Sequence, residues 1–191
     1  MFGVTSATGA ALGASAVLGY KAQWILGSVG GDATTLKALG VPAAVLTGSI
    51  GASFLPGTSD TKDEYIKQFQ DINTKYNKGA VFDNNVLVGM NAGMLTVEAL
   101  RAAGRNLTRA SLLAAVASKG STWASAGFAG LGYSSTSHVG YNGYWFGKYG
   151  VTGDLKPVDG KYVVYQTDSG SGPIVKSTYK RPAMPAKGLP A

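Results

Sequence analysis

The chain of 191 residues lacks cysteine altogether and contains one histidine, His138. Without cysteine it can form no disulfide, no thiolate nucleophile and no Cys-ligated zinc site. With one histidine it can form no cluster of histidine ligands and no H-E-x-x-H zinc motif. The G-x-S-x-G elbow, the P-loop and the full G-x-G-x-x-G fingerprint are also missing, and no two carboxylates are spaced for acid–base work. We therefore expect no enzymatic activity, no metal and no cofactor.

Charged residues are scarce as well, at 14% of the chain, against ~25% in ordinary globular proteins. Lys and Arg outnumber Asp and Glu by 17 to 10, which gives a net charge of +7. The basic residues are spread thinly along the chain instead of forming a stripe, so we expect no nucleic-acid partner. Their one cluster, Lys176, Lys180, Arg181 and Lys187, is interpreted as a solvated basic end of the chain.

Long apolar runs are absent too, because no segment reaches the ~18 residues of a membrane-spanning helix. Residues 1–18 are rich in Ala, Gly and Leu, but no Lys or Arg precedes Lys21 and three glycines interrupt the segment. A secretory leader normally begins with a basic region. We therefore interpret this stretch as folded structure.

Short apolar segments alternate with helical patterns along the chain, which is typical of an α/β fold. Residues 7–18 predict a small-residue helix, and residues 23–26 predict a buried strand. A glycine-rich loop, residues 27–32, follows, and Asp32 at its end can cap a helix. Residues 46–54 alternate apolar and small polar side chains with a period of two, which predicts a second strand.

Two longer helices are predicted next, over residues 60–76 and 83–103. Each has an apolar stripe at spacings of three and four residues. Gly104 is suited to end the second helix, and Thr108 is suited to cap a third, shorter one. In the remainder, residues 144–146 and 162–165 predict strands, and the chain from Ser169 onward is expected to be a loosely held tail.

The loop of residues 27–32 is the one candidate site that the residues themselves suggest. In open α/β sheets, ligands bind beyond the carboxyl ends of the strands, where backbone amides and small side chains can approach them. Ser28 and the backbone N–H groups of this loop could hold a polar ligand in that way. The composition of the loop fits a plain connection between a strand and a helix equally well.

The order of the elements over residues 1–165 resembles that in the C-terminal half to two-thirds of the proteins of a known family. This family is the type I periplasmic solute-binding proteins of ABC transporters, in particular the branched-chain amino-acid group. The matching segments are residues 16–21 (AVLGYK), 24–28 (WILGS), 52–56 (ASFLP), 98–104 (EALRAAG) and 137–140 (SHVG).

The resemblance implies a fold of two α/β lobes that is incomplete at its N-terminus in this chain. It assigns residues 1–47 to lobe two, 48–140 to lobe one, and 141–191 to a return into lobe two followed by the C-terminal tail. Half-covered lobes leave sheet edges and apolar faces open, so we expect the chain to self-associate.

The resemblance also implies a function: binding of a small polar ligand such as an amino acid or amide in an interlobe cleft, followed by docking of the closed form on a membrane permease. The location would be periplasmic or extracellular, with or without a lipid anchor on the full-length protein. The ligand contacts would come from two loops, namely Phe2, Gly3 and Thr5 in the first and Gly27, Ser28 and Gly30 in the second. Ser28 stands where amino-acid binders often carry an acid, and a hydroxyl cannot neutralise an ammonium group.

Two alternatives from other classes remain open at this stage. The same fold could serve as a ligand-sensing regulatory module that signals to a protein partner. The positive charge and the basic C-terminal cluster could instead belong to a surface protein that binds an acidic polymer, an interaction that would weaken steeply with salt.

Overall fold

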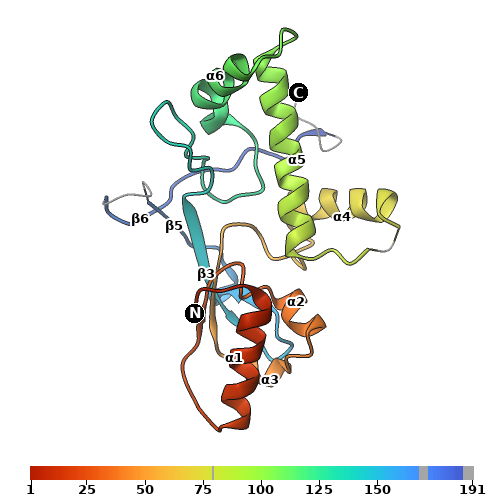
Figure 1. Ribbon diagram of the computed structural model, residues 1–191, viewed down its shortest axis with the longest axis vertical. Coiled ribbons are helices and arrows are strands. Elements are labelled where there is room, and N and C mark those ends of the chain that lie inside the picture. The colour runs from red at the N-terminus through yellow and green to blue at the C-terminus, as the bar shows by residue number, and fades with distance from the viewer. Residues whose placement is uncertain (79, 168–171, 187–191) are drawn as a thin grey trace. The chain divides into compact units, whose positions relative to one another are not determined.

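The computed structural model describes residues 1–78, 80–167 and 172–186 (Figure 1). The helices and strands are α1 Thr5–Val17, β1 Ile25–Leu26, α2 Ala33–Ala38, α3 Ala43–Leu46, β2 Ile50–Ser53, α4 Glu64–Tyr76, α5 Asn84–Ala103, α6 Arg109–Lys119, β3 Gly143–Tyr149, β4 Leu155–Pro157, β5 Val164–Gln166 and β6 Val175–Lys176, with short 3₁₀ turns at Gly120–Thr122 and Val158–Gly160. The mixture of sheet and helices confirms the predicted α/β class.

The chain forms two compact units. Unit 1 contains Met1–Ser53 and Trp145–Val163, and unit 2 contains Phe54–Tyr144 and Val164–Ala191. The chain therefore passes from one unit to the other after Ser53, after Tyr144 and after Val163. The correspondence of these units to the two expected lobes stays a prediction.

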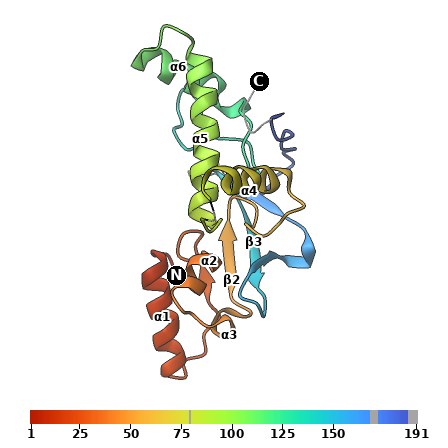
Figure 2. The ribbon, with the colours of Figure 1, turned by 90° about the vertical axis from the view of Figure 1, so that its right-hand side faces the viewer.

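The sheet of unit 1 is built from β1, β2, β3 and β4. β1 pairs in parallel with β2, with Ile25 opposite Ile50, and β3 runs antiparallel to both β2 and β4. Met1 lies beside β1: its amino group donates to the Ile25 carbonyl, and its carbonyl accepts from the Gly27 N–H at 3.1 Å. These bonds follow the pattern of a parallel pair. Met1 and β1 consequently run in the direction of β2, whose arrow is visible in Figure 2. All three reach the same end of the sheet, which we call the carboxyl end.

The helices α1, α2 and α3 cover one face of this sheet. A single buried cluster joins them to the strands and consists of Leu12, Leu36, Val41, Leu46, Leu26 and Tyr149. The prediction of a helix over residues 7–18 is confirmed by α1, and the prediction that Asp32 caps a helix is confirmed at α2, where its carboxylate accepts from the Thr34 N–H at 3.1 Å.

In unit 2 the predicted ends of α5 and α6 are confirmed by their capping contacts. The Asp83 side chain accepts from the Val86 N–H at 2.8 Å, and Gly104 ends α5 with a φ of 80°. Thr108 and Ser111 form a reciprocal capping box at the start of α6. Each contact satisfies an N–H or a backbone geometry that a helix terminus leaves open.

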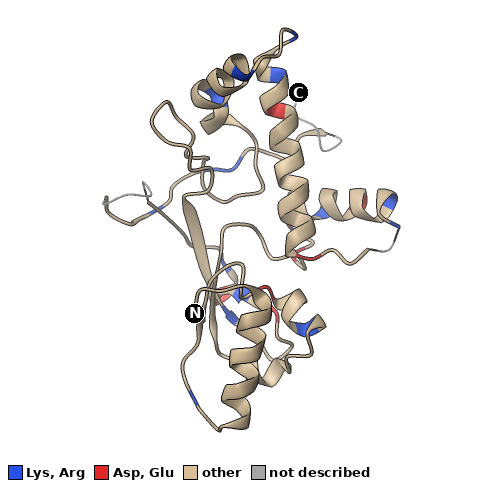
Figure 3. Cartoon of the chain, in the orientation of Figure 1, with Lys and Arg blue, Asp and Glu red and all other residues tan. Residues whose placement is uncertain are grey.

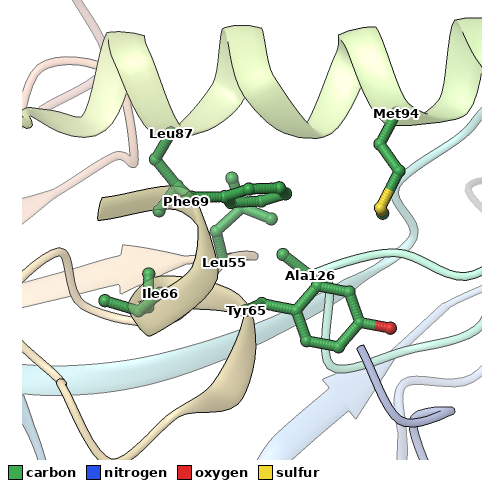
Figure 4. Close-up of a cluster of buried hydrophobic side chains, with 7 residues drawn as sticks. All are labelled: Leu55, Tyr65, Ile66, Phe69, Leu87, Met94 and Ala126. Atoms are coloured by element: carbon green, nitrogen blue, oxygen red, sulfur yellow. The ribbon is translucent and has the colours of Figure 1, made fainter. Parts of the chain in front are cut away.

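The main core of unit 2 lies between α4, α5 and the loops that flank them. Its buried members are Leu55, Tyr65, Ile66, Phe69, Leu87, Met94 and Ala126 (Figure 4). The side chains of Phe69 and Leu87 meet between the two helices, and Met94 fills the same core from α5. Met94 thus belongs to the hydrophobic core.

A buried polar network anchors α5 to the chain that follows α6. The Asn91 side chain donates to the Ser125 hydroxyl at 3.1 Å and to the Tyr141 hydroxyl, and its oxygen accepts from the Ala126 N–H at 2.8 Å. α5 is 20 residues long and apolar enough for a membrane span by length and composition, although the sequence has no fully apolar run. Core helices of folded domains pass the same test, and buried Asn91 and Glu98 here bond to residues 124–126.

Glu98 is buried, with 8% of its surface exposed, and only one of its carboxylate oxygens is bonded. Oε1 accepts from the Ala124 N–H at 3.2 Å, whereas Oε2 has no partner within the described residues. Burial raises the pKa of Glu98, and the bond from Ala124 opposes that rise only in part. The titratable groups that interact electrostatically with Glu98 include Tyr65 and Tyr179. The Arg181 guanidinium interacts with the same two tyrosines and lowers their pKa, whereas the Glu98 charge raises it.

We predict that this carboxyl makes unit 2 less stable as the pH rises. The pKa of Glu98 is higher in the folded state than in the unfolded state. Its contribution to the free energy of unfolding is therefore greatest at a pH below the ordinary glutamate pKa of about 4.3, and it is lost as the pH rises through the folded-state pKa. Glu98→Gln should flatten this part of the profile of unfolding free energy against pH, measured by urea denaturation. Glu64→Gln, at an exposed position at the start of α4, is the control and should leave the pH profile intact. An unchanged profile in Glu98→Gln would contradict the role of Glu98 in this pH dependence.

The expectation of a loosely held C-terminal tail is wrong for residues 172–186. Arg181 donates to the Asp63 carboxylate at 2.5 Å and to the Ala126 carbonyl at 2.9 Å, and the Tyr65 hydroxyl donates to the Pro182 carbonyl at 2.9 Å. The basic cluster is therefore not simply solvated, because Arg181 is an internal partner. Lys187 lies outside the described residues.

Three further sequence predictions need correction. The strand predicted over residues 46–54 begins only at Ile50, because Leu46 ends the helix α3 and Gly48 breaks the extended chain with a φ of 84°. The helix predicted from residue 60 begins at Glu64, where Asp63 caps it through the N–H groups of Tyr65 and Ile66. The short strands β4 and β6 were not predicted, and β1 is only two residues long.

Candidate functional site

Two segments that follow parallel strands meet at the carboxyl end of the unit 1 sheet. Residues 2–5 lead from Met1 into α1, and residues 27–32 lead from β1 into α2. The Thr5 hydroxyl joins them by donating to the Val29 carbonyl at 3.0 Å. We call these segments the first loop (residues 2–5) and the second loop (residues 27–32).

Glycines allow the two loops to approach each other. A Cβ on Gly30 would lie 2.5 Å from both the Gly3 carbonyl oxygen and the Thr8 hydroxyl. A Cβ on Gly27 would lie 3.0 Å from the ring of Phe2. Since Cβ atoms do not approach other atoms as closely as 2.5 Å, position 30 requires glycine for this arrangement of the loops.

The back of the second loop is fixed by groups that the sequence does not single out. The Tyr149 hydroxyl, from β3, donates to the Gly31 carbonyl and is buried. Burial raises the pKa of Tyr149, with a further contribution from the charge of Asp32, so the hydroxyl remains a proton donor. No sequence pattern connects Tyr149 to Gly31, because the two are 118 positions apart.

Asp32 closes the second loop at the start of α2. One carboxylate oxygen accepts from the Thr34 N–H at 3.1 Å and the other from the Thr35 hydroxyl at 2.6 Å. Both oxygens are thus bonded within the helix cap. The role of Asp32 here is to hold the loop and the helix together.

The structure brings all the predicted site residues into these two loops. Phe2 is 93% exposed, Gly3 is exposed, and Gly30 is buried beneath the first loop. Thr5 uses its hydroxyl on Val29, so it positions the second loop. The Ser28 hydroxyl has no partner within the described residues, and the residue is half-buried. The contact of these residues with a ligand stays a prediction.

The described residues contain no group of three or more His, Asp or Glu side chains that could hold a metal ion. His138 is exposed in a loop of unit 2.

Comparison of the sequence with known protein families identifies one family. A family model described as periplasmic binding protein matches residues 1–154. No curated protein sequence matches the chain.

Two solved structures share the fold. One is a branched chain amino acid ABC transporter protein from Thermus thermophilus with bound valine, at 21% identity and a TM-score of 0.69, covering 81% of this chain and 43% of its own. The other is a substrate-binding periplasmic protein from Ralstonia solanacearum, at 19% identity and a TM-score of 0.70, covering 81% of this chain and 44% of its own. The chain thus spans less than half the length of either protein. Since the family model covers most of the sequence, the chain belongs to the periplasmic binding protein family.

Proposed function

We propose that the chain is part of an extracytoplasmic solute-binding protein of an ABC uptake transporter. The observation that carries this proposal is the joining of two glycine-containing loops at the carboxyl end of the parallel strands β1 and β2, within the region that matches the family. Ligands of open α/β sheets bind at that end, beyond the strands. The protein from Thermus thermophilus, which shares this fold, was solved with valine bound.

In this proposal, unit 1 corresponds to lobe two of the family, and the ligand contacts come from Phe2, Gly3 and Thr5 of the first loop and Gly27, Ser28 and Gly30 of the second. Phe2 offers an exposed apolar surface, and Ser28 offers a free hydroxyl. Binding would select a closed state that docks on a membrane permease in the periplasm or outside the cell. No covalent step is involved.

The proposal is tested by thermal-shift screening of the chain with branched-chain amino acids, their amides and small carboxylates. A ligand that binds only the folded state raises the unfolding temperature. We expect one of these classes to stabilise the chain and Ser28→Ala to weaken that effect. If no member of any class raises the unfolding temperature, the solute-binding function fails.

Binding of an acidic polymer is less well supported than solute binding. Arg181, which belongs to the basic C-terminal cluster, is bonded to Asp63 with side-chain exposures of 15% and 6%. A paired, half-buried guanidinium is a poor contact for an external polyanion. A sensing role for the same fold would use the same two loops and would differ in its protein partner.

We also expect the chain to self-associate. On the unit 1 sheet, Ile25 and Phe146 are 52% and 47% exposed, and the register places them on the face opposite α1, α2 and α3. Exposed apolar side chains gathered on one face of a sheet favour association with another chain. Sedimentation at micromolar concentration should show oligomers that Ile25→Thr with Phe146→Thr reduces, and a monodisperse monomer would contradict this expectation.

A further inference from the structure

The carbonyl groups of the second loop are mostly bonded within the protein. The Gly27 carbonyl accepts from the Gly31 N–H at 2.8 Å, and the Val29 carbonyl accepts from the Thr5 hydroxyl at 3.0 Å. The Gly31 carbonyl accepts from the buried Tyr149 hydroxyl. Few acceptors of this loop are therefore left for a ligand.

The donors of the same loop have the opposite status. In the described part of the chain, the N–H groups of Ser28, Val29 and Gly30 have no partner, and neither has the Ser28 hydroxyl. Successive backbone N–H groups of this kind favour an acceptor or an anion. The first turn of α1, which follows the first loop, adds N–H groups that have no side-chain cap and no acidic neighbour, since α1 carries no charged residue at all (Figure 3).

Unit 1 also lacks a free carboxylate beside the two loops. Both oxygens of Asp32 are bonded within the α2 cap. Asp154 is paired with Lys37 at 2.5 Å and precedes β4 beside Tyr149, toward the opposite end of the sheet. Asp159 follows β4, and β2 and β3 lie between β4 and β1 in the sheet. At the usual spacing of neighbouring strands, β4 is roughly 14 Å from β1. Unit 1 further contains five lysines against these three aspartates.

We infer that the two loops of unit 1 bind an acceptor group of the ligand, a carboxylate or an amide carbonyl, and not an ammonium group. This inference rests on the proposed function and specifies the ligand class for the same site. An ammonium group offers donors only and is best held by a carboxylate together with several acceptors. The second loop has no free carboxylate, and of its backbone carbonyls only those of Ser28 and Gly30 are left without a partner in the described part of the chain. A carboxylate or carbonyl matches the unpaired donors of Ser28, Val29 and Gly30.

The test compares three probes of one carbon skeleton by isothermal titration calorimetry: L-valine, 3-methylbutanoate and 3-methylbutanamide. The whole chain is used, together with Ser28→Asp, which places a carboxylate in the second loop. Ala44→Asp is the matched control, because it adds the same charge at an exposed position of α3, ahead of β2. Circular dichroism establishes that each variant is folded.

We expect 3-methylbutanoate or 3-methylbutanamide to bind the chain at least about tenfold more tightly than valine. Ser28→Asp should reverse the order by weakening the carboxylate and strengthening valine, and Ala44→Asp should preserve it. Tighter binding of valine to the unaltered chain would overturn the inference while leaving solute binding intact. Absence of binding by all three probes to the chain and to both variants would remove the proposed function and the inference with it.

Discussion

Arg181→Ala is expected to lower the free energy of unfolding of unit 2 by about 3–5 kcal/mol, the cost of breaking a buried ion pair from one side. The guanidinium donates to the Asp63 carboxylate and to the Ala126 carbonyl. It also lies 4.4 Å from the ring centre of Tyr65 and 5.0 Å from that of Phe128. Alanine would leave the Asp63 carboxylate, the cap of α4, largely buried without a counter-charge.

Two further variants separate this interaction from a general effect of charge. Arg181→Lys keeps the charge but loses the planar fork and should recover only part of the stability. Lys180→Ala, at the exposed neighbouring position, should change the free energy by no more than about 0.5 kcal/mol. Hydrogen exchange of the α4 amides reports on unit 2 directly, and equal protection in Arg181→Ala and Lys180→Ala would show that the C-terminal segment does not hold α4.

Gly30→Ala is expected to abolish ligand binding and to destabilise unit 1 by about 1–3 kcal/mol, the usual cost of overpacking. The added methyl group would lie 2.5 Å from the Gly3 carbonyl oxygen and from the Thr8 hydroxyl. The first loop must then move away from the second, and the bond from Thr5 to the Val29 carbonyl would break.

Gly13→Ala provides the matched comparison. Gly13 lies in α1 with nothing within 4 Å of an added Cβ. Alanine should stabilise the helix by about 0.5–1 kcal/mol there, because it loses less backbone entropy than glycine. The same chemical change is thus predicted to have opposite signs at two positions of unit 1, as measured by thermal denaturation. A stabilising effect at position 30 would mean that the two loops are not in close contact.

The longer helices α1, α4, α5 and α6 could be predicted from the sequence because their signals are local. Asp83 and Thr108 each begin a helix by accepting from the N–H group three positions ahead, and the capping motif lies within that span. The strand boundaries could not be predicted in the same way. The apparent alternation from Leu46 crosses a helix end and Gly48, and the pairing of β2 with β3 joins residues almost a hundred positions apart.

The candidate site shows the same division between local and distant information. The second loop could be found because it follows a predicted strand and is rich in glycine. Its support could not be found, because Tyr149 and Thr5 reach it from distant parts of the chain. The ion pair between Arg181 and Asp63 joins residues 118 positions apart. Because no local pattern reveals such a contact, the composition of the C-terminal segment indicated a solvated tail.

The most direct test of solute binding is a titration of the ¹⁵N-labelled chain with 3-methylbutanoate, followed through the backbone amide resonances. We expect the amides of Gly3, Thr5, Ser28 and Gly30 to shift together and to saturate along one binding curve. Val29 should shift with them, whereas the amides of α6 should stay in place. Shifts confined to other parts of the chain, or none in the two loops at saturating concentrations of any of the three probes, would contradict a ligand site at the carboxyl end of the unit 1 sheet.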